Sequence, residues 1–152
     1  MSRRAHRIAL VLIAAGTLVV GLWASVLPRS FYDDFPGLGR VWVAVDGPYN
    51  EHLVRDVGGL NLGLALVALV ALVTGSALVG RTAGGAALVY GLPHLLYHAT
   101  HLDPFDAGEA AAVVVALVIA VAAALLAALP VRDPAGPAVS PGTARRRTGR
   151  PS

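Results

Sequence analysis

Histidine and tyrosine side chains gather in one apolar stretch of this chain, at spacings that a helix would bring together. The stretch reads Tyr90-Gly-Leu-Pro93-His94-Leu-Leu-Tyr97-His98-Ala-Thr-His101-Leu-Asp103. At about 3.6 residues per turn, His94, His98 and His101 fall within roughly 60° of one helical face. Neutral imidazoles bind zinc, copper and iron, and they exchange protons near neutral pH. This face is therefore the first candidate for chemistry.

A second polar segment follows Asn50, which is expected to cap a helix. Within this segment His52, Asp56, Gly59 and Gly63 share one helical face. The G-x-x-x-G spacing of the two glycines allows another helix to pack closely. We therefore expect this face to point inward, with Gly59 and Gly63 as packing residues.

The two polar segments are expected to meet. The residues Gly80-Arg81-Thr82 predict a tight turn, which would make the flanking helices antiparallel neighbours. His52 and Asp56 would then lie at about the height of the last two histidines. The predicted polar pocket comprises His52, Asp56, Tyr90, His94, Tyr97, His98, His101 and Asp103.

Three interpretations of this pocket stay open. The first is a metal or haem site, with His52, His94, His98 and His101 as the candidate metal ligands. The second is a hydrogen-bonded network that only ties two helices together. The third is a pocket for a small molecule or for proton transfer, without metal. The sequence does not identify a cofactor or a catalytic residue.

The surrounding elements are membrane helices. Four stretches are long enough to cross a hydrocarbon core about 30 Å thick, at approximately 8–27, 57–79, 83–102 and 108–129. The predicted fold is an all-α integral membrane protein, a four-transmembrane-helix up-down bundle. It occupies residues 1–130, and residues 131–152 form a tail rich in Arg, Pro and Gly that we expect to be disordered and cytoplasmic.

Composition agrees with the membrane interpretation. Of 152 residues, 56% are hydrophobic and only 14% are charged, and cysteine is absent, which excludes disulfides and thiolate metal sites. The first stretch resembles a signal peptide in its basic start, but its apolar run exceeds the roughly 7 to 15 residues of such signals. The lipid bilayer is the expected partner, with another membrane subunit or a small molecule as further candidates.

Arginine placement predicts the orientation. Arginines precede the first stretch, follow the fourth and occupy the predicted turn at Arg81, whereas the other two loops are acidic. Positive loops stay in the cytoplasm, so both termini are expected there, in the plasma membrane. His6 is expected to belong to this cytoplasmic charge. Because topology explains the arginines, nucleic acid is not an expected partner.

Two motifs carry a family resemblance, Glu51-His52-x-x-Arg55-Asp56-x-Gly and Pro93-His94-x-x-x-His98-x-x-His101-Leu-Asp103. With them the chain resembles uncharacterised small four-span membrane proteins of actinobacterial type, and its layout is similar to the broad DoxX-like group. Some DoxX-like proteins are membrane partners of oxidoreductases, so the resemblance implies a redox association.

The favoured function is a binding or accessory module whose His-rich pocket lies at the outer face, between the second and third helices. The alternative is a membrane enzyme or a redox-complex subunit that binds metal or haem through the histidines. We favour the module because the sequence contains no nucleophile elbow and no phosphate loop.

Overall fold

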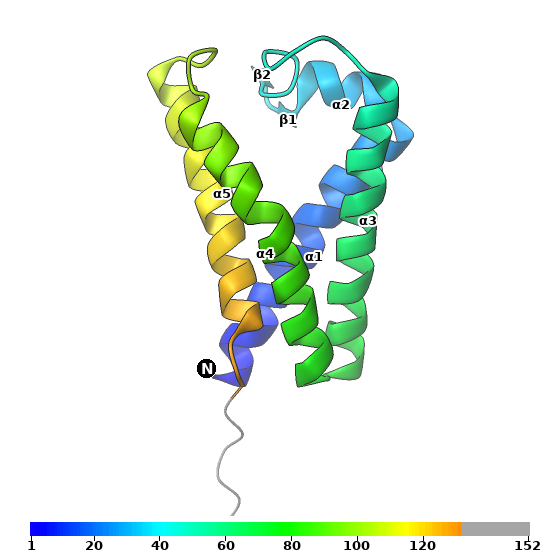
Figure 1. Ribbon diagram of the computed structural model, residues 1–152. Helices are drawn as coiled ribbons and strands as arrows, with labels where there is room; N and C mark the ends of the chain where they lie inside the picture. The colour runs from blue at the N-terminus through cyan, green and yellow to red at the C-terminus, as the bar shows by residue number, and fades with distance from the viewer. Residues whose placement is uncertain (132–152) are drawn as a thin grey trace, which may run out of the picture.

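The computed structural model describes residues 1–131, which fold almost entirely into helices (Figure 1). The predicted tail therefore lies outside the described residues, apart from Val131. The elements in chain order are α1 (Arg3–Val26), α2 (Pro28–Asp34), β1 (Pro36–Gly37), β2 (Arg40–Val41), α3 (Glu51–Thr74), α4 (Ala77–Thr100) and α5 (Ala107–Ala128).

Within residues 1–131, α1, α3 and α5 are long and apolar enough to cross a membrane. These helices indicate a membrane protein and agree with three of the predicted spans. Helix α4 is as long as α1, at 24 residues, but it is not among the three. Its histidines, tyrosines and glycines and Arg81 lower its mean hydropathy.

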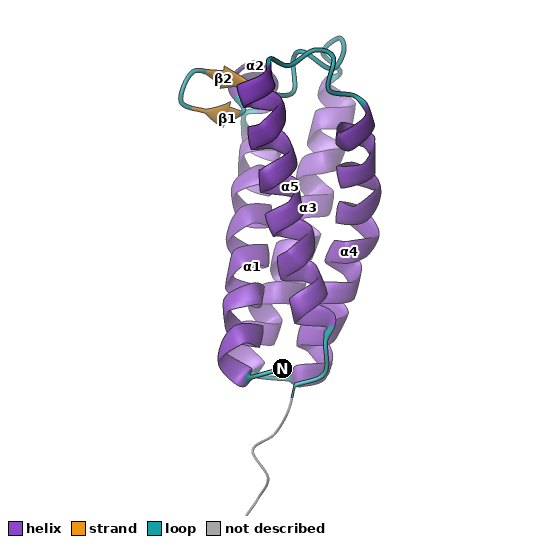
Figure 2. Ribbon diagram, turned by 90° about the vertical axis from the view of Figure 1, so that its left-hand side faces the viewer, coloured by secondary structure: helices purple, strands orange, loops and turns teal. Residues whose placement is uncertain are grey.

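The long helices run alternately up and down, so both ends of the described chain meet at one end of the molecule. We call this end the base, and the opposite end, which carries α2 and the two short strands, the top (Figure 1). The amino group of Met1 donates a hydrogen bond to the carbonyl of Pro130 at 3.0 Å, which joins the two chain ends at the base. Figure 2 shows the long helices side by side, with the β1–β2 hairpin projecting from the top.

The connection between α3 and α4 lies at Gly75 and Ser76, so the predicted turn at Gly80-Arg81-Thr82 is wrong. Gly75 adopts a left-handed conformation with φ 65°, and its N–H donates to the carbonyl of Ala71 at 3.0 Å, which ends α3. Ser76 then caps α4 by accepting from the N–H of Val79. The residues predicted to turn lie inside α4.

Helix α1 packs closely on α3 because glycines remove side chains at the contact. Gly58 lies against the backbone of Ala24 and Ser25, and Gly21 lies against Leu62. In lipid, helices associate through such close packing, because the hydrocarbon around them is as apolar as their own side chains.

Gly59 and Gly63, the predicted packing residues, do not take part in this contact. Both are exposed, and a Cβ added at either would meet nothing within 4 Å. Successive helical residues point about 100° apart, so packing through Gly58 turns the Gly59 face away from α1. The face of α3 that carries Gly59 and Gly63 was predicted to point inward, but in the structure it points outward.

A layer of small side chains joins the four long helices near the base. Alanine dominates this layer, and Gly84 of α4 lies against the backbone of Ala127 and Ala128 on α5. At the top, larger aromatic residues fill the space between α1, α2 and α3, and Figure 1 shows α3 further from α4 there than at the base. The buried members of the basal layer are Ala9, Leu10, Ile13, Ala14, Ala68, Ala71, Ala83, Ala87, Ala123, Ala124 and Ala127.

The adjacent glycines of α3 give a direct test of this packing. We expect Gly58→Ala to lower the free energy of unfolding by about 1–3 kcal/mol, because the added methyl group overlaps the backbone of α1. Gly59→Ala is the matched control and should leave stability unchanged or slightly higher, since it adds helix propensity in open space. Thermal unfolding in mild detergent measures both, and equal effects of the two variants would contradict the packing.

Candidate functional site

The predicted histidine face exists on α4 as a continuous series of ring contacts, which we call the ring ladder (Tyr90, His94, His98, Tyr97 and His101). Tyr90 and His94 are stacked, with ring centroids 5.6 Å apart and an interplanar angle of 15°. His94 meets His98 edge to face at 4.8 Å, and Tyr97 stacks on His101 at 4.2 Å. Tyr97 also contacts His98, at 5.5 Å. The structure thus brings together the five aromatic residues predicted on this helix.

The acidic neighbour of the ladder is Asp46, which lies in the loop between β2 and α3. The hydroxyl of Tyr97 donates to Oδ1 of Asp46 at 3.2 Å. The Asp46 carboxylate is also close enough to interact electrostatically with His94 and His98. Sequence reasoning missed Asp46 because it considered acidic residues only on or beside the helices.

His52 and Asp56 do not join the ladder. They pair with each other on α3, with 3.3 Å between Nε2 of His52 and Oδ2 of Asp56, and their side chains are 88% and 61% exposed. They lie on the same outward face as Gly59, which is why the predicted meeting with His98 and His101 does not form. Asp103 is exposed in the turn after α4 and has no hydrogen bond or ion pair within residues 1–131.

The predicted metal set is therefore not assembled. Within residues 1–131, no three His, Asp or Glu side chains converge in a way that could hold a metal ion. His52 is on another face, and Nδ1 of His101 turns back to the carbonyl of Tyr97 at 2.9 Å. The ladder is built from ring contacts, and its histidines do not point at a common centre.

A groove lies beside the ladder, along the seam where α3 meets α4. Its volume is about 670 Å³, and we call it the α3–α4 groove. Neither ring nitrogen of His94 has a hydrogen-bond partner among residues 1–131, and Nδ1 of His98 is buried without one. The groove therefore borders a histidine with free hydrogen-bonding capacity. Its lining residues are Leu60, Leu64, Ala86, Val89, Tyr90, Pro93 and His94.

Asn61 connects α3 to the lower end of the ladder. Its side chain is 3% exposed, and Nδ2 donates to the carbonyl of Val57 at 2.9 Å and to the hydroxyl of Tyr90 at 3.5 Å. The bond to Tyr90 joins α3 to α4. This bond fixes Tyr90 beside the groove.

The loop between α2 and α3 covers the top of the ring ladder. It bonds to the α4–α5 side of the molecule and to the α1–α2 side. On the α5 side, Nε1 of Trp42 donates to Oε2 of Glu109 at 2.6 Å, and Arg40 pairs with the same carboxylate at 3.4 Å. On the α4 side the contact is the bond from Tyr97 to Asp46. The side chain of Glu109 thus binds the loop, while the side chain of Asp106 caps α5.

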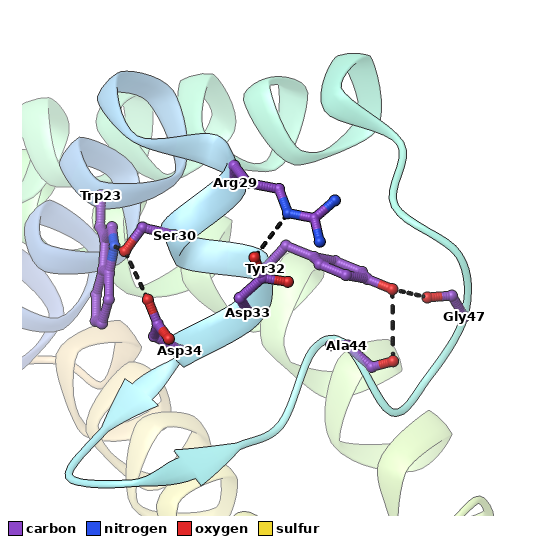
Figure 3. Close-up of polar contacts among 8 residues, drawn as sticks. All are labelled: Trp23, Arg29, Ser30, Tyr32, Asp33, Asp34, Ala44 and Gly47. Carbon is purple, nitrogen blue, oxygen red and sulfur yellow. Dashed lines mark hydrogen bonds and ion pairs between the residues drawn. The ribbon is translucent and has the colours of Figure 1, made fainter.

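On the α1 side, helix α2 anchors the same loop, as Figure 3 shows. The hydroxyl of Tyr32 donates to the carbonyls of Gly47 and Ala44. Arg29 lies over the ring of Tyr32 and donates to Asp33 at 2.6 Å, and this hydrogen bond raises the pKa of Arg29 above its ordinary value. The loop is therefore fixed at both ends over the ladder.

His6, expected among the basic charges, is instead buried in the base. It is 7% exposed, it lies against Gly80, and neither of its ring nitrogens has a hydrogen-bond partner among residues 1–131. Only Gly at position 80 leaves room for this ring, because a Cβ there would overlap it. His6 thus contributes to packing between α1 and α4, far along the helices from the ladder.

No family model, curated protein or solved structure matches the chain. The chemistry of the site is therefore inferred from its own geometry. The features that carry it are the ring nitrogens of His94, which have no hydrogen-bond partner among residues 1–131, the carboxylate of Asp46 and the apolar α3–α4 groove.

The bond between Trp42 and Glu109 can be tested by removing its donor. We expect Trp42→Phe to reduce the free energy of unfolding by about 1–2 kcal/mol, because a charge-assisted hydrogen bond is lost while most of the ring packing remains. Since the native chain has no cysteine, spin labels on introduced cysteines at Leu53 and Ala107 report the separation of α3 and α5 at the top. That separation should widen in Trp42→Phe.

Trp23→Phe is the control for this experiment. Nε1 of Trp23 donates to Ser30 at 3.2 Å, and both residues belong to the α1–α2 side (Figure 3). Its loss should not change the measured separation. An unchanged separation in Trp42→Phe as well would show that the loop does not hold the two halves together.

Proposed function

We propose that the chain is a multi-pass protein of the plasma membrane, that α4 is its fourth crossing, and that both termini are cytoplasmic. Helices α3 and α5 both run from top to base, so the segment between them must return to the top, and α4 is the helix that does so. Basic residues at the base and acidic residues at the top support a cytoplasmic base.

Within this topology, the protein acts as a binding or accessory module that holds a ligand at the ring ladder. One observation carries this function: His94 lines a groove of about 670 Å³ and has no hydrogen-bond partner among residues 1–131. A polar group inside a membrane helix is costly unless another group satisfies it. A bound molecule would supply that group. The resemblance to small four-span, broadly DoxX-like proteins belongs to the same proposal.

The other two interpretations have less support. A purely structural network would use the hydrogen-bonding capacity of the histidines, yet within the described residues His94 makes ring contacts but no hydrogen bond, and Nδ1 of His98 has no partner. A membrane enzyme or redox subunit with metal or haem would need converging ligands, and the described histidines do not converge. A binding pocket fits the observed geometry better than either.

Copurification tests the function. We expect protein extracted from its membrane in mild detergent to carry a bound small molecule, detectable by mass spectrometry, that is lost in His94→Ala and retained in His52→Ala. His52 is the matched control because its side chain is 88% exposed and pairs with Asp56, away from the groove. Metal content and the visible spectrum are recorded on the same samples.

Two outcomes would contradict the binding function in different ways. A preparation without any bound molecule, whose His94→Ala variant only unfolds at a lower temperature, would make the ladder a structural element. A bound metal or a haem spectrum lost in His94→Ala would favour the redox alternative.

The fourth crossing has its own test. In the cysteine-free chain, Ala99→Cys at the end of α4 should react with a membrane-impermeant maleimide added outside intact cells. Ala77→Cys, at the start of the same helix, should react only after the cells are opened. Both positions are exposed in the folded chain, so a difference reports the membrane and not burial. Labelling of both from one side would exclude the crossing.

A further inference from the structure

The α3–α4 groove changes in polarity along the helix axis. Its lower part is lined by Leu64 and Ala86, and its upper end by His94. His94 precedes the end of α4 by six residues, which corresponds to about 9 Å along the axis. A helix of 24 residues is about 36 Å long, slightly more than a hydrocarbon core of about 30 Å. His94 therefore lies just inside the outer edge of the hydrocarbon, and the rest of the groove lies deeper.

This gradient matches a molecule that is itself dissolved in the membrane. A lipid has an apolar chain at depth and a polar head near the surface, which is the order of side chains in the groove. The groove walls are also at the molecular surface, since Val89 is 79% and Leu60 is 50% exposed. In a bilayer that surface faces lipid. At the top, by contrast, the bond between Tyr97 and Asp46 holds the loop across the ladder.

The charged residues near the groove indicate which type of lipid headgroup it can accept. Its lining contains no arginine, and the chain contains no lysine. The arginines at the top are paired elsewhere, Arg29 with Asp33 and Arg40 with Glu109, for example. A phosphate or carboxylate head at His94 would therefore lack an arginine or lysine partner, and the Asp46 carboxylate, which interacts electrostatically with His94, would repel it. A neutral head also avoids the cost of a charge inside the hydrocarbon edge.

We infer that the α3–α4 groove binds a neutral lipid with a hydroxyl head, which enters sideways from the bilayer. Its hydroxyl group bonds to His94, and its chain lies along Leu60, Leu64 and Val89. A hydroxyl group both donates and accepts, so it satisfies the imidazole in either tautomer. The volume of about 670 Å³ is in the range of ordinary small-molecule sites. This inference rests on the proposed function and names the ligand class of the same site.

The test uses a monoacylglycerol with a photoreactive diazirine in its acyl chain. The full-length protein is placed in phosphatidylcholine nanodiscs that contain this probe, and cross-linked residues are mapped by mass spectrometry. We expect labelling within residues 60–64 and 86–94, competed by unlabelled monoacylglycerol. A diazirine fatty acid and a diazirine phosphatidylcholine of equal chain length serve as probes with a charged and a zwitterionic head.

Two pairs of variants make the result specific. Leu60→Trp fills the groove while keeping His94, and Leu66→Trp is its control, because Leu66 is 62% exposed on α3 and does not line the groove. We expect Leu60→Trp to abolish competed labelling and Leu66→Trp to preserve it. His94→Ala should weaken competition about tenfold, the loss expected for one hydrogen bond, whereas His52→Ala should not.

Equal labelling by the phosphatidylcholine probe, without competition, would mean ordinary surrounding lipid and would overturn the inference. Stronger capture of the fatty acid would overturn the neutral head. If copurification yields a water-soluble molecule that depends on His94, and the lipid probe does not label the groove, this inference fails while the proposed function stands. If copurification yields no bound molecule and the lipid probe does not label the groove, both fail.

Discussion

Close packing of small residues near the base is the constraint on which the rest of the structure depends. Lipid gives helices little hydrophobic reason to associate, so contact must come from backbones that approach closely. Alanines from all four long helices provide this contact, and Gly84 brings α4 against the backbone of α5. The basal layer therefore sets how the helices are arranged about one another.

The top of the molecule follows from that arrangement. There α1 and α3 stay together through Gly21 and Gly58, but α3 and α4 move apart. Aromatic residues and the loop after α2 occupy the top, and the loop is bonded to Tyr32 on one side and to Glu109 on the other. The ring ladder lies beneath this loop. It borders the α3–α4 groove, which lies along the seam between the two diverging helices. The packed layer at the base and the groove nearer the top are thus two consequences of one distribution of side-chain sizes.

The polar side chains of α3 and α4 differ in whether they find hydrogen-bond or ion-pair partners within the described residues. His52 and Asp56 pair with each other in exposed positions, and Asn61 bonds to its own helix and to Tyr90. His94 and His98 have no hydrogen-bond partner for their ring nitrogens among residues 1–131, and of these two His94 lines the groove. A molecule in the groove would therefore find its hydrogen-bond partner at His94.

The sequence by itself determined the helical membrane character, the cap at Asn50, and the shared face of His94, His98 and His101, because these depend on composition and on contacts within one helix. Tertiary structure decided which neighbours each face meets. Gly58 and Gly59 are equivalent as sequence, and only the position of α1 makes the first a packing residue. In the same way, Asp46 reaches the ladder through a loop whose path depends on side chains far along the chain, including Glu109.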